Sequence, residues 1–349
     1  MDATAVFINV LFLVANLIEI ANGQTQRSCT LSNGLSGICV PIRDCPSAVA
    51  LLKQRRQANI CSYINDEPVV CCEKQLAIGE KSKNFCSNLI KIIKETIKIL
   101  VVGGTDSLAA EFPHMAVLGF RNNDNIIWAC GGALISEKFV MTAGHCLYHS
   151  EFGDVRAVRL GDLNLYSETD DAKPQNFLVK STHRHPRYMP PSRYNDIALV
   201  ELDRAATRTK YVLPACLNTQ MFIHSSNAFT ATGWGSLEFS GRQADHLQKV
   251  NISLVDNGRC NQFYSLSRKL RAGIRDDSQI CASSPHRDTC EGDSGGPLQR
   301  KFPFGNNDFV YVIYGVTSFG KACGLSSTPG IYTRVSYFLD WIEPIVWPN

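Results

Sequence analysis

The chain has 349 residues, of which 44% are hydrophobic and 19% are charged. This composition is that of ordinary globular proteins, and the length allows more than one domain. The formal net charge of +3 is too small to indicate a nucleic-acid partner or binding to an anionic surface. The 14 cysteines are an even number without paired CxxC spacing, which favours disulfides over a metal–thiolate site.

The N-terminus carries a short apolar run from Ala5 to Ile18, followed by the small residues Ala21 and Gly23. The run is shorter than an ordinary membrane span, and the small residues stand where a signal peptidase would read the chain. Asp2 departs from the pattern, because a basic residue is usual there. The sequence predicts a signal peptide over residues 1–23, a secreted protein and no membrane span.

Residues 29–72 contain six cysteines in a segment too short to bury much apolar surface, so disulfides must hold it together. Adjacent Cys71 and Cys72 cannot readily bond each other. The connectivity is otherwise not deducible, since six cysteines allow about 15 pairings in all. The run from Cys39 to Pro46, closed by the Cys71-Cys72 doublet, resembles the clip domain of arthropod serine proteases. We expect a clip domain over residues 24–72, with a generic disulfide knot as the alternative. The resemblance implies the pairs Cys29–Cys71, Cys39–Cys61 and Cys45–Cys72.

Residues 73–100 form a lysine-rich connector with a single cysteine, Cys86. From Ser87 onward, apolar and lysine residues recur at roughly helical spacing, and Ser87 is a candidate N-cap. We expect a solvated linker with a short helix rather than a membrane-active basic helix.

The composition changes at Val101. Beyond it, short β-branched runs are separated by Gly, Pro, Asn and Asp, which predicts an all-β barrel or sandwich over residues 101–349. Examples of such runs are Phe139–Met141, Ile197–Val200 and Phe309–Ile313. In this region only Tyr337–Ile345 has the spacing of a helix.

The stretch from Asp288 to Pro297 holds Ser294 between glycines that allow a tight turn. In such a turn the N–H groups of Gly292 and Ser294 point at one spot, where they would stabilise an oxyanion. A serine nucleophile also needs a base and a group that orients the base. His145 and Asp196 are candidates, although singly they could be a structural histidine and a turn residue.

The order His145, Asp196, Ser294, each in its own motif, resembles the chymotrypsin-like serine proteases from Val101 to the end of the chain. The resemblance implies a double antiparallel β-barrel with a C-terminal helix. It makes His145 the general base and later acid, Asp196 its orienting carboxylate, and Ser294 the nucleophile. It also implies the disulfides Cys130–Cys146, Cys260–Cys281 and Cys290–Cys323. Cys86 and Cys216 are left, and their pairing would tether the N-terminal segment to the protease.

Substrate choice is expected to depend on Asp288, which stands where the family places the base of the specificity pocket. Such a carboxylate favours Arg or Lys before the scissile bond. Gly320 and Gly330 match wall positions where bulk would block entry, and Ser318 resembles the serine that supports the catalytic aspartate. The alternative for Asp288 is an ordinary surface carboxylate.

The segment beginning at Val101 resembles the new N-terminus of cleaved zymogens. Its freed α-ammonium is expected to pair with Asp293, because burying that carboxylate unpaired would be unfavourable. Most relatives have Arg or Lys before this bond, but this chain has Leu100. We therefore expect cleavage between Leu100 and Val101 by another protease, since an enzyme that prefers Arg or Lys would not activate itself efficiently.

Two further sites have weaker signals. Asn251 begins the chain's N-glycosylation triplet. Asp162 lies in a loop where some relatives bind calcium, with Asp170 and Asp171 nearby, but an exposed acidic loop is the better interpretation. No cofactor is expected to be required.

The resemblance implies a secreted zymogen in an extracellular cascade of arthropods, leading to Toll activation or to prophenoloxidase and melanisation. Its partners would be an upstream activating protease, a downstream zymogen or other protein substrate, and a serpin-type inhibitor. The cleavage site at Leu100 resembles that of the snake- and persephone-like subgroup of these proteases. The alternatives are a digestive or venom trypsin, and a catalytically silent clip-domain cofactor or adhesion protein.

Overall fold

The computed structural model divides between Ala77 and Ile78 into two compact units, each described by itself below. It describes residues 27–32, 34, 36–73, 76–96, 109–123, 125–167, 169–170, 172–223, 228–235, 243–284, 293–305, 308–320 and 328–348. The predicted signal peptide lies outside these residues. None of the described helices is both long and apolar enough to cross a membrane.

The N-terminal unit is a small antiparallel sheet with one helix. The strands β1 (Ser28–Thr30), β2 (Ser36–Pro41), β3 (Ile60–Ile64) and β4 (Glu67–Glu73) lie in the order β1-β2-β4-β3. The 3-10 turn η1 (Ile42–Asp44) and the helix α2 (Pro46–Lys53) follow β2, and proline at the first helical position suits a helix start.

Three disulfides hold this unit together, because its apolar core is little more than Cys45, Ala48 and Val70. The bonds are Cys29–Cys71, Cys39–Cys61 and Cys45–Cys72, the pairs that the resemblance implied. Cys71 and Cys72 are consecutive in β4, so their side chains leave opposite faces of the strand. This geometry explains why the two neighbours bond to different partners.

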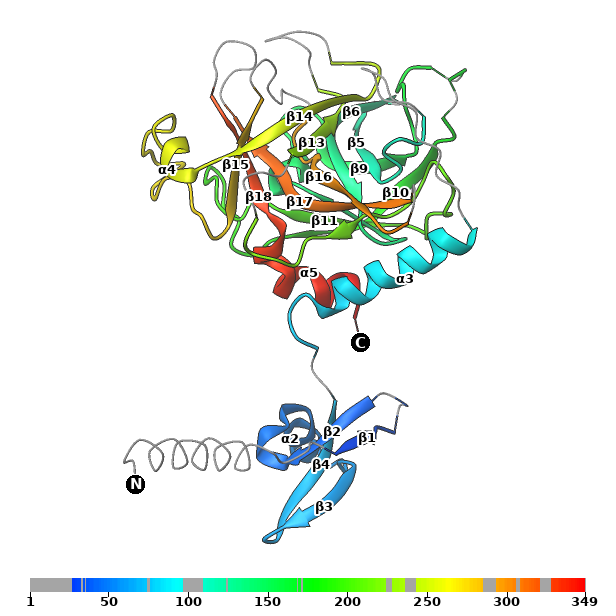
Figure 1. Ribbon diagram of the computed structural model, residues 1–349, viewed down its shortest axis with the longest axis vertical. Coiled ribbons are helices and arrows are strands. Elements are labelled where there is room, and N and C mark those ends of the chain that lie inside the picture. Colours follow the sequence, from blue (N-terminus) through cyan, green and yellow to red (C-terminus); the bar gives the residue numbers. More distant parts are fainter. Residues whose placement is uncertain are drawn as a thin grey trace, which may run out of the picture. The chain divides into compact units, whose positions relative to one another are not determined.

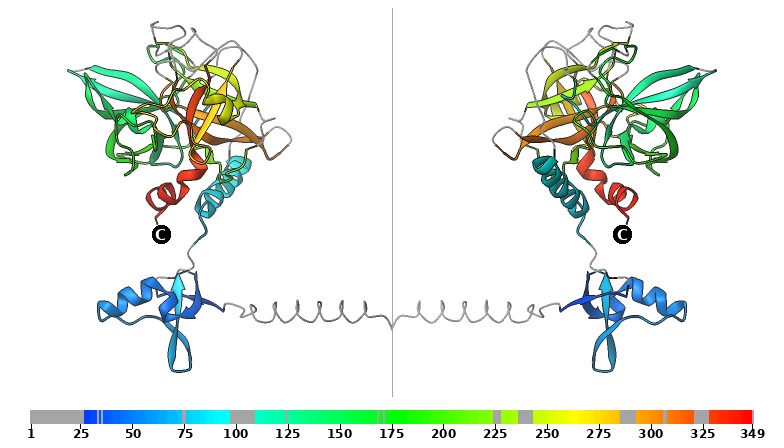
Figure 2. Two further views of the ribbon diagram at one scale, coloured as in Figure 1. Left: turned by 90° about the vertical axis from the view of Figure 1, so that its left-hand side faces the viewer. Right: turned by 90° about the vertical axis from the view of Figure 1, so that its right-hand side faces the viewer.

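The second unit is built on two closed six-stranded antiparallel barrels (Figures 1 and 2), which confirms the predicted all-β double barrel. The first runs β10-β11-β7-β6-β5-β9 and closes through β9 and β10; the second runs β17-β16-β13-β14-β15-β18 and closes through β17 and β18. The first barrel comprises β5 (Met115–Asn122), β6 (Asn125–Leu134), β7 (Phe139–Thr142), β9 (Gly153–Leu160), β10 (Gln175–Arg184) and β11 (Ala198–Leu202). The second comprises β13 (Ala228–Gly233), β14 (Gln248–Val255), β15 (Gln279–Ser283), β16 (Pro297–Pro303), β17 (Phe309–Phe319) and β18 (Gly330–Arg334).

Short elements complete the unit: β8 (Tyr148–His149) pairs with β9, and β12 (Cys216–Leu217) runs parallel to β17. The 3-10 turns η2 (Gly144–Leu147) and η3 (Val335–Phe338) and the helices α4 (Asn257–Cys260) and α5 (Leu339–Val346) lie between or after the strands. The predicted C-terminal helix therefore starts as a 3-10 turn and continues as α5. The sequence pattern did not predict α4, which is a single turn capped by the Asp256 carboxylate.

The connector helix corrects one prediction. Helix α3 (Glu80–Thr96) starts seven residues before Ser87, which is therefore not its N-cap. One face of the helix is also buried rather than solvated, because Leu89 and Ile93 are only 1% and 2% exposed where they pack beside Cys216. The helix lies along α5 in Figure 1, and the disulfide Cys86–Cys216 fastens it.

The start of α3 is stabilised by a side chain from the other end of the chain. The Glu343 carboxylate of α5 accepts hydrogen bonds from the N–H groups of Gly79 (3.0 Å) and Ser82 (2.8 Å). A carboxylate at a helix N-terminus satisfies unpaired N–H groups and interacts favourably with the helix dipole. Because this cap comes from α5, local sequence around residue 80 could not reveal it.

His114 is a buried histidine whose titration should affect stability. Its Nε2 is hydrogen-bonded to the Gln299 side chain, and its ring contacts the ring of Tyr311. Burial lowers the pKa of His114 from 6.5 to about 3, although the bond to Gln299 acts in the opposite direction. Between these values the unfolded state binds a proton that the folded state does not. Stability from this residue is therefore complete above pH 6.5 and is lost as the pH falls towards 3.

We expect His114→Phe to flatten the pH dependence of thermal unfolding between pH 6.5 and 4. His114 contributes a slope of at most about 1.4 kcal/mol per pH unit, which the variant lacks. The measurement is the Tm across this range for the variant, the unmodified chain and a control, His246→Phe, at a half-buried histidine. An unchanged slope in the His114 variant would contradict the assignment.

Candidate active site

His145 and Asp196 form a hydrogen-bonded pair. His145 Nδ1 lies 2.8 Å from Asp196 Oδ2, and the backbone N–H of His145 donates to Asp196 Oδ1 at 2.9 Å. His145 lies in η2, which the disulfide Cys130–Cys146 joins to β6. A carboxylate on Nδ1 holds the imidazole in one orientation and one tautomer, which leaves Nε2 available as a base.

Asp196 is 1% exposed and is held from several sides. Ser318 Oγ donates to its Oδ2 at 2.5 Å, and Thr333 Oγ1 donates to its backbone oxygen at 2.8 Å. Burial acts to raise the pKa of Asp196, but the charge of His145 and the hydrogen bonds from His145 and Ser318 outweigh it and lower the pKa. The side chain is therefore a carboxylate that stabilises a positive charge on His145.

Ser294 is placed beside this pair by backbone contacts. The backbone N–H of Gly131 donates to the backbone carbonyl oxygen of Ser294 at 2.8 Å. The Thr142 hydroxyl donates to the backbone carbonyl oxygen of Gly131, also at 2.8 Å. Gly295 has φ +80°, and a Cβ there would lie 2.5 Å from the Gly131 oxygen and would also meet the Thr142 hydroxyl. Only glycine allows so close an approach to the segment that leads to His145.

The three predicted residues thus come together from η2, the loop just before β11 and the turn before β16. Among the described residues, no hydrogen bond joins the Ser294 hydroxyl to His145. Such catalytic hydrogen bonds are often long before substrate binds. The arrangement is suited to nucleophilic attack by a hydroxyl that an oriented imidazole deprotonates.

Only some residues of the predicted specificity pocket belong to the described part of the chain. Ser318 lies near the end of β17 and Gly320 directly follows that strand, and a Cβ on Gly320 would meet no atom of the described residues within 4 Å. Gly330 begins β18, and the preceding Pro329 oxygen accepts a 2.5 Å hydrogen bond from Tyr264. The two predicted wall positions are therefore glycines at the ends of neighbouring strands, and their role in a specificity pocket stays a prediction.

Several predicted residues lie outside the described part of the chain. They are Leu100, Val101, Asp288, Gly292 and the pair Cys290–Cys323. Asp293 is described, and its Oδ1 accepts the Gly235 N–H at 3.0 Å. The ion pair of Asp293 with Val101 stays a prediction. The disulfide Cys260–Cys281 is present.

The calcium prediction has little support from the surroundings of Asp162. Its Oδ2 lies 3.0 Å from the Arg159 guanidinium, and its Oδ1 accepts the Leu163 N–H at 2.8 Å. Burial raises the pKa of Asp162, although Arg159 opposes this effect. The Asp170 carboxylate accepts the N–H groups of Asn164 and Ala172. Because protein donors occupy these oxygens, the described residues do not fit a calcium ion, and Asp171 lies outside them.

The remaining residues are the predicted glycosylation site and the supporting residues that sequence patterns did not indicate. Asn251 is exposed on β14, so a glycan could reach it, and its modification stays a prediction. Thr333 and Tyr264 support the site through contacts between distant segments. No local motif marks them, so sequence reasoning alone did not find them.

Known proteins share both units of this chain. Residues 101–342 match the family Trypsin, and residues 29–72 match the regulatory CLIP domain of proteinases. A venom serine protease of Bombus ignitus is 33% identical over 95% of each chain. Serine protease snk of Drosophila melanogaster is 35% identical over 90% of this chain and 77% of its own. Phenoloxidase-activating factor 3 of Holotrichia diomphalia is 35% identical over 93% and 95%, respectively.

A solved structure agrees with these relatives. The Drosophila Grass clip serine protease of the Toll pathway has a TM-score of 0.62 and 25% identity, covering 93% of this chain and 98% of that one. The fold and the site therefore define a serine endopeptidase. The chain belongs to the trypsin family, as one of the clip-domain serine proteases of arthropods.

Proposed function

We propose that the chain is a secreted zymogen that, once cleaved, cuts protein substrates after Arg or Lys. The observation that carries the catalytic part is the buried Asp196, hydrogen-bonded to both His145 and Ser318. The backbone at Ser294 packs against Gly131, beside the segment that leads to His145. Ser294 attacks the scissile carbonyl while His145 takes its proton, and His145 later returns the proton to the leaving amine. The N–H groups of Gly292 and Ser294 stabilise the oxyanion.

Specificity for Arg or Lys rests on Asp288 at the base of the pocket and on the open walls at Gly320 and Gly330. A carboxylate in a largely desolvated pocket binds a guanidinium or ammonium group strongly. None of the described residues comes within 4 Å of a Cβ placed on Gly320, which is compatible with the entry of a long side chain.

Activation is proposed to follow cleavage between Leu100 and Val101. The new α-ammonium of Val101 pairs with Asp293, which directly precedes Ser294. This pairing couples the cut to the position of the nucleophile. An upstream protease that accepts Leu100 makes the cut, and the Cys86–Cys216 disulfide retains α3 and the clip unit afterwards.

The physiological setting proposed is an extracellular cascade of innate immunity, ending in Toll activation or in prophenoloxidase activation. The names of phenoloxidase-activating factor 3 and of the Grass protease of the Toll pathway support this setting. The substrate would be a downstream zymogen, and a serpin-type inhibitor would end the activity. A venom enzyme is the second candidate, favoured by the Bombus ignitus relative.

The specificity is tested with peptides that carry Arg, Lys or Phe before the scissile bond. We expect kcat/KM of the activated chain for Arg to exceed that for Phe by at least about 100-fold, because Asp288 would stay unpaired with Phe. Asp288→Ser should remove this preference, whereas Asp276→Ser, at an exposed carboxylate, should preserve it. A preference of the unmodified chain for Phe would refute Arg or Lys specificity.

A further inference from the structure

Two loop segments beside the active site are rich in cations. Residues 185–195, within the loop between β10 and β11, contain Arg187 and Arg193, and residues 264–274 contain Arg268, Lys269 and Arg271. The carboxylates that follow them in sequence are Asp196, which is buried, and Asp276 and Asp277. None of these five cations forms an ion pair with another described residue. The next residue, Arg275, is paired with Asp277 at 2.7 Å, so it adds no free charge. We call the five side chains the cationic rim.

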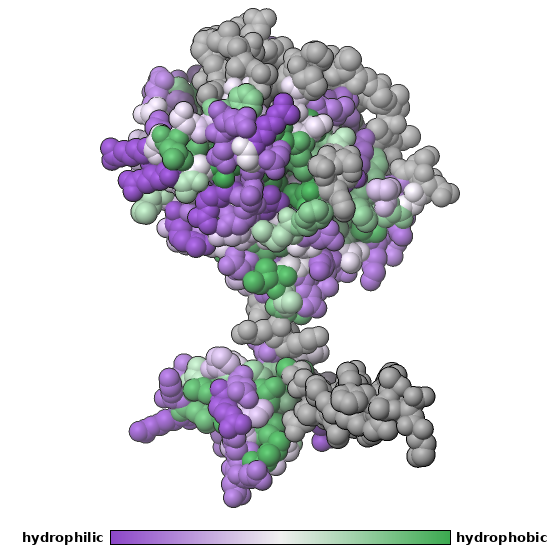
Figure 3. Space-filling view, turned by 60° about the vertical axis from the view of Figure 1, so that its left-hand side comes forward, coloured by the Kyte–Doolittle hydropathy of each residue, from purple (hydrophilic) through white to green (hydrophobic). Residues whose placement is uncertain are grey.

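The two loops form one continuous surface. The Arg193 N–H donates to the Lys269 oxygen at 2.9 Å, and Tyr194 Oη donates to the Gly273 oxygen at 2.9 Å. The Ala272 N–H donates in turn to Tyr194 Oη at 2.8 Å. These bonds hold cations from two parts of the chain next to each other. Figure 3 turns the side of the unit that carries α4 forward, and hydrophilic side chains cover much of this face.

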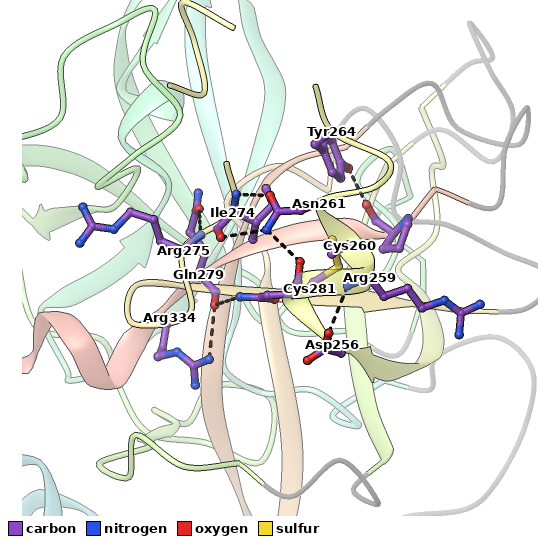
Figure 4. Close-up of a disulfide and its surroundings, with 12 residues drawn as sticks. Asp256, Arg259, Cys260, Asn261, Tyr264, Ile274, Arg275, Gln279, Cys281 and Arg334 are labelled. Carbon is purple, nitrogen blue, oxygen red and sulfur yellow. Dashed lines mark hydrogen bonds between the residues drawn. A yellow bond between two sulfur atoms is a disulfide. The ribbon is translucent and has the colours of Figure 1, made fainter. Parts of the chain in front are cut away.

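The second loop is fixed at its base (Figure 4). The Cys260–Cys281 disulfide joins α4 to β15, and Asn261 bridges to the far end of the loop. Its side chain accepts the Ile274 N–H at 2.7 Å and donates to the Ile274 oxygen at 3.3 Å. A loop held in this way presents its charges without a large ordering cost when a partner binds.

Arg193 brings the rim to the mouth of the proposed pocket. Its guanidinium carbon lies 5.1 Å from the centre of the Phe319 ring, and the Tyr264 ring meets the same ring edge-on. Phe319 lies between Ser318, which is bonded to Asp196, and Gly320 of the pocket wall. The aromatic ring positions the guanidinium, while its N–H groups form no hydrogen bond with a described residue. Such a guanidinium is suited to accept a carboxylate in a bidentate manner.

We propose that the cationic rim binds acidic residues of the protein substrate on the N-terminal side of the scissile bond. The inference rests on the proposed function, in which the pocket holds the residue before that bond. Residues further towards the substrate's N-terminus then leave the pocket mouth beside Phe319 and Arg193. The substrate class is therefore an acidic segment followed by Arg or Lys. Complementary charge of this kind selects partners and accelerates their association.

The test compares three fluorogenic peptides with the same Arg before the scissile bond, using the activated full chain after active-site titration. One has Glu and Asp before the Arg, one has Gln and Asn there, and one has the acidic residues after the scissile bond. We expect kcat/KM for the first peptide to exceed that for the second by about tenfold at low salt. This ratio should approach one at 0.5 M salt, since exposed charges are then screened. The third peptide should show no gain over the second.

Two variants test whether the cationic rim causes the higher kcat/KM for the acidic peptide. One is Arg193→Gln, and the other combines Arg268→Gln, Lys269→Gln and Arg271→Gln. Each should reduce the acidic-to-neutral ratio, whereas Arg156→Gln, at an exposed cation of β9, should keep it.

Equal kcat/KM for acidic and neutral peptides in the unmodified chain would overturn the inference but leave the proposed function standing. A ratio that survives in both rim variants would also overturn it. If the rim variants lost only binding to heparin oligosaccharides, with the peptide ratio unchanged, the surface would be a polysaccharide site and the inference would be wrong. Failure to hydrolyse any Arg peptide would refute the proposed function and the inference together.

Discussion

We expect Asp196→Asn to lower kcat of the activated enzyme by about 10⁴-fold without unfolding it. The amide oxygen of asparagine can still accept the backbone N–H of His145. The amide NH₂ group, however, cannot accept a hydrogen bond from the Nδ1–H of the imidazole. His145 would then adopt the other tautomer, with its proton on Nε2, where it cannot take the proton of Ser294. The hydrogen bond from Ser318 Oγ, at 2.5 Å in the native chain, would also be lost or weakened. The measurement is kcat on an Arg peptide, with the Tm recorded in parallel.

The matched control for this substitution is Asp154→Asn, at a carboxylate that is 69% exposed on β9. It should leave kcat unchanged. If Asp196→Asn stayed within tenfold of the native kcat while folding normally, the assignment of Asp196 as the orienting carboxylate would be wrong.

We expect Asp293→Asn to keep the chain nearly inactive after the cut between Leu100 and Val101. An amide cannot form an ion pair with the α-ammonium of Val101, and losing one partner of a buried pair costs about 3 to 5 kcal/mol. If the active conformation alone is destabilised by this amount, kcat/KM drops by roughly 10² to 5 × 10³-fold. The hydrogen bond from Gly235 N–H can persist, because asparagine retains an acceptor oxygen.

N-terminal sequencing should find Val101 in both the cut variant and the cut native chain, so that only the ion pair differs. The uncut native chain is the second control. Incubated alone, it should neither gain activity nor acquire an N-terminal Val101, because Leu100 does not suit an Arg- or Lys-specific enzyme. Full activity of the cut variant would contradict the role of Asp293, and spontaneous release of Val101 would contradict activation by another protease.

Much of the site could be predicted because its residues lie in local motifs. Asp196 and His145 each stand in a short characteristic run, and the structure brings them to 2.8 Å. The clip disulfides could be predicted for the same reason, since the resemblance supplied a pairing that spacing alone left open. Local motifs do not carry contacts between distant segments, and that is where prediction failed.

Helix α3 illustrates the failure. Its periodic apolar residues predicted a helix, but its start depends on Glu343, which is 264 residues from Gly79 in sequence. The burial of Leu89 depends equally on a distant partner, the segment around Cys216. A pattern within the connector could indicate an apolar face but not what covers it.

The net charge of the chain could not predict the cationic rim. A net charge of +3 over the whole chain gave no reason to expect an acidic partner. Arg193 and Lys269 are far apart in sequence, yet a 2.9 Å hydrogen bond joins their backbones. Folding concentrates cations next to the active site, although the average over the chain is nearly neutral.

The most direct test of the central claim is labelling of the chain by a fluorophosphonate, followed by peptide mapping, before and after a cut between Leu100 and Val101. A fluorophosphonate reacts with a serine only when a base activates it. We predict stoichiometric labelling of Ser294 in the cut chain and little or none in the uncut chain. An unlabelled Ser294 in a chain with a verified N-terminal Val101, or equal labelling before and after the cut, would contradict the account.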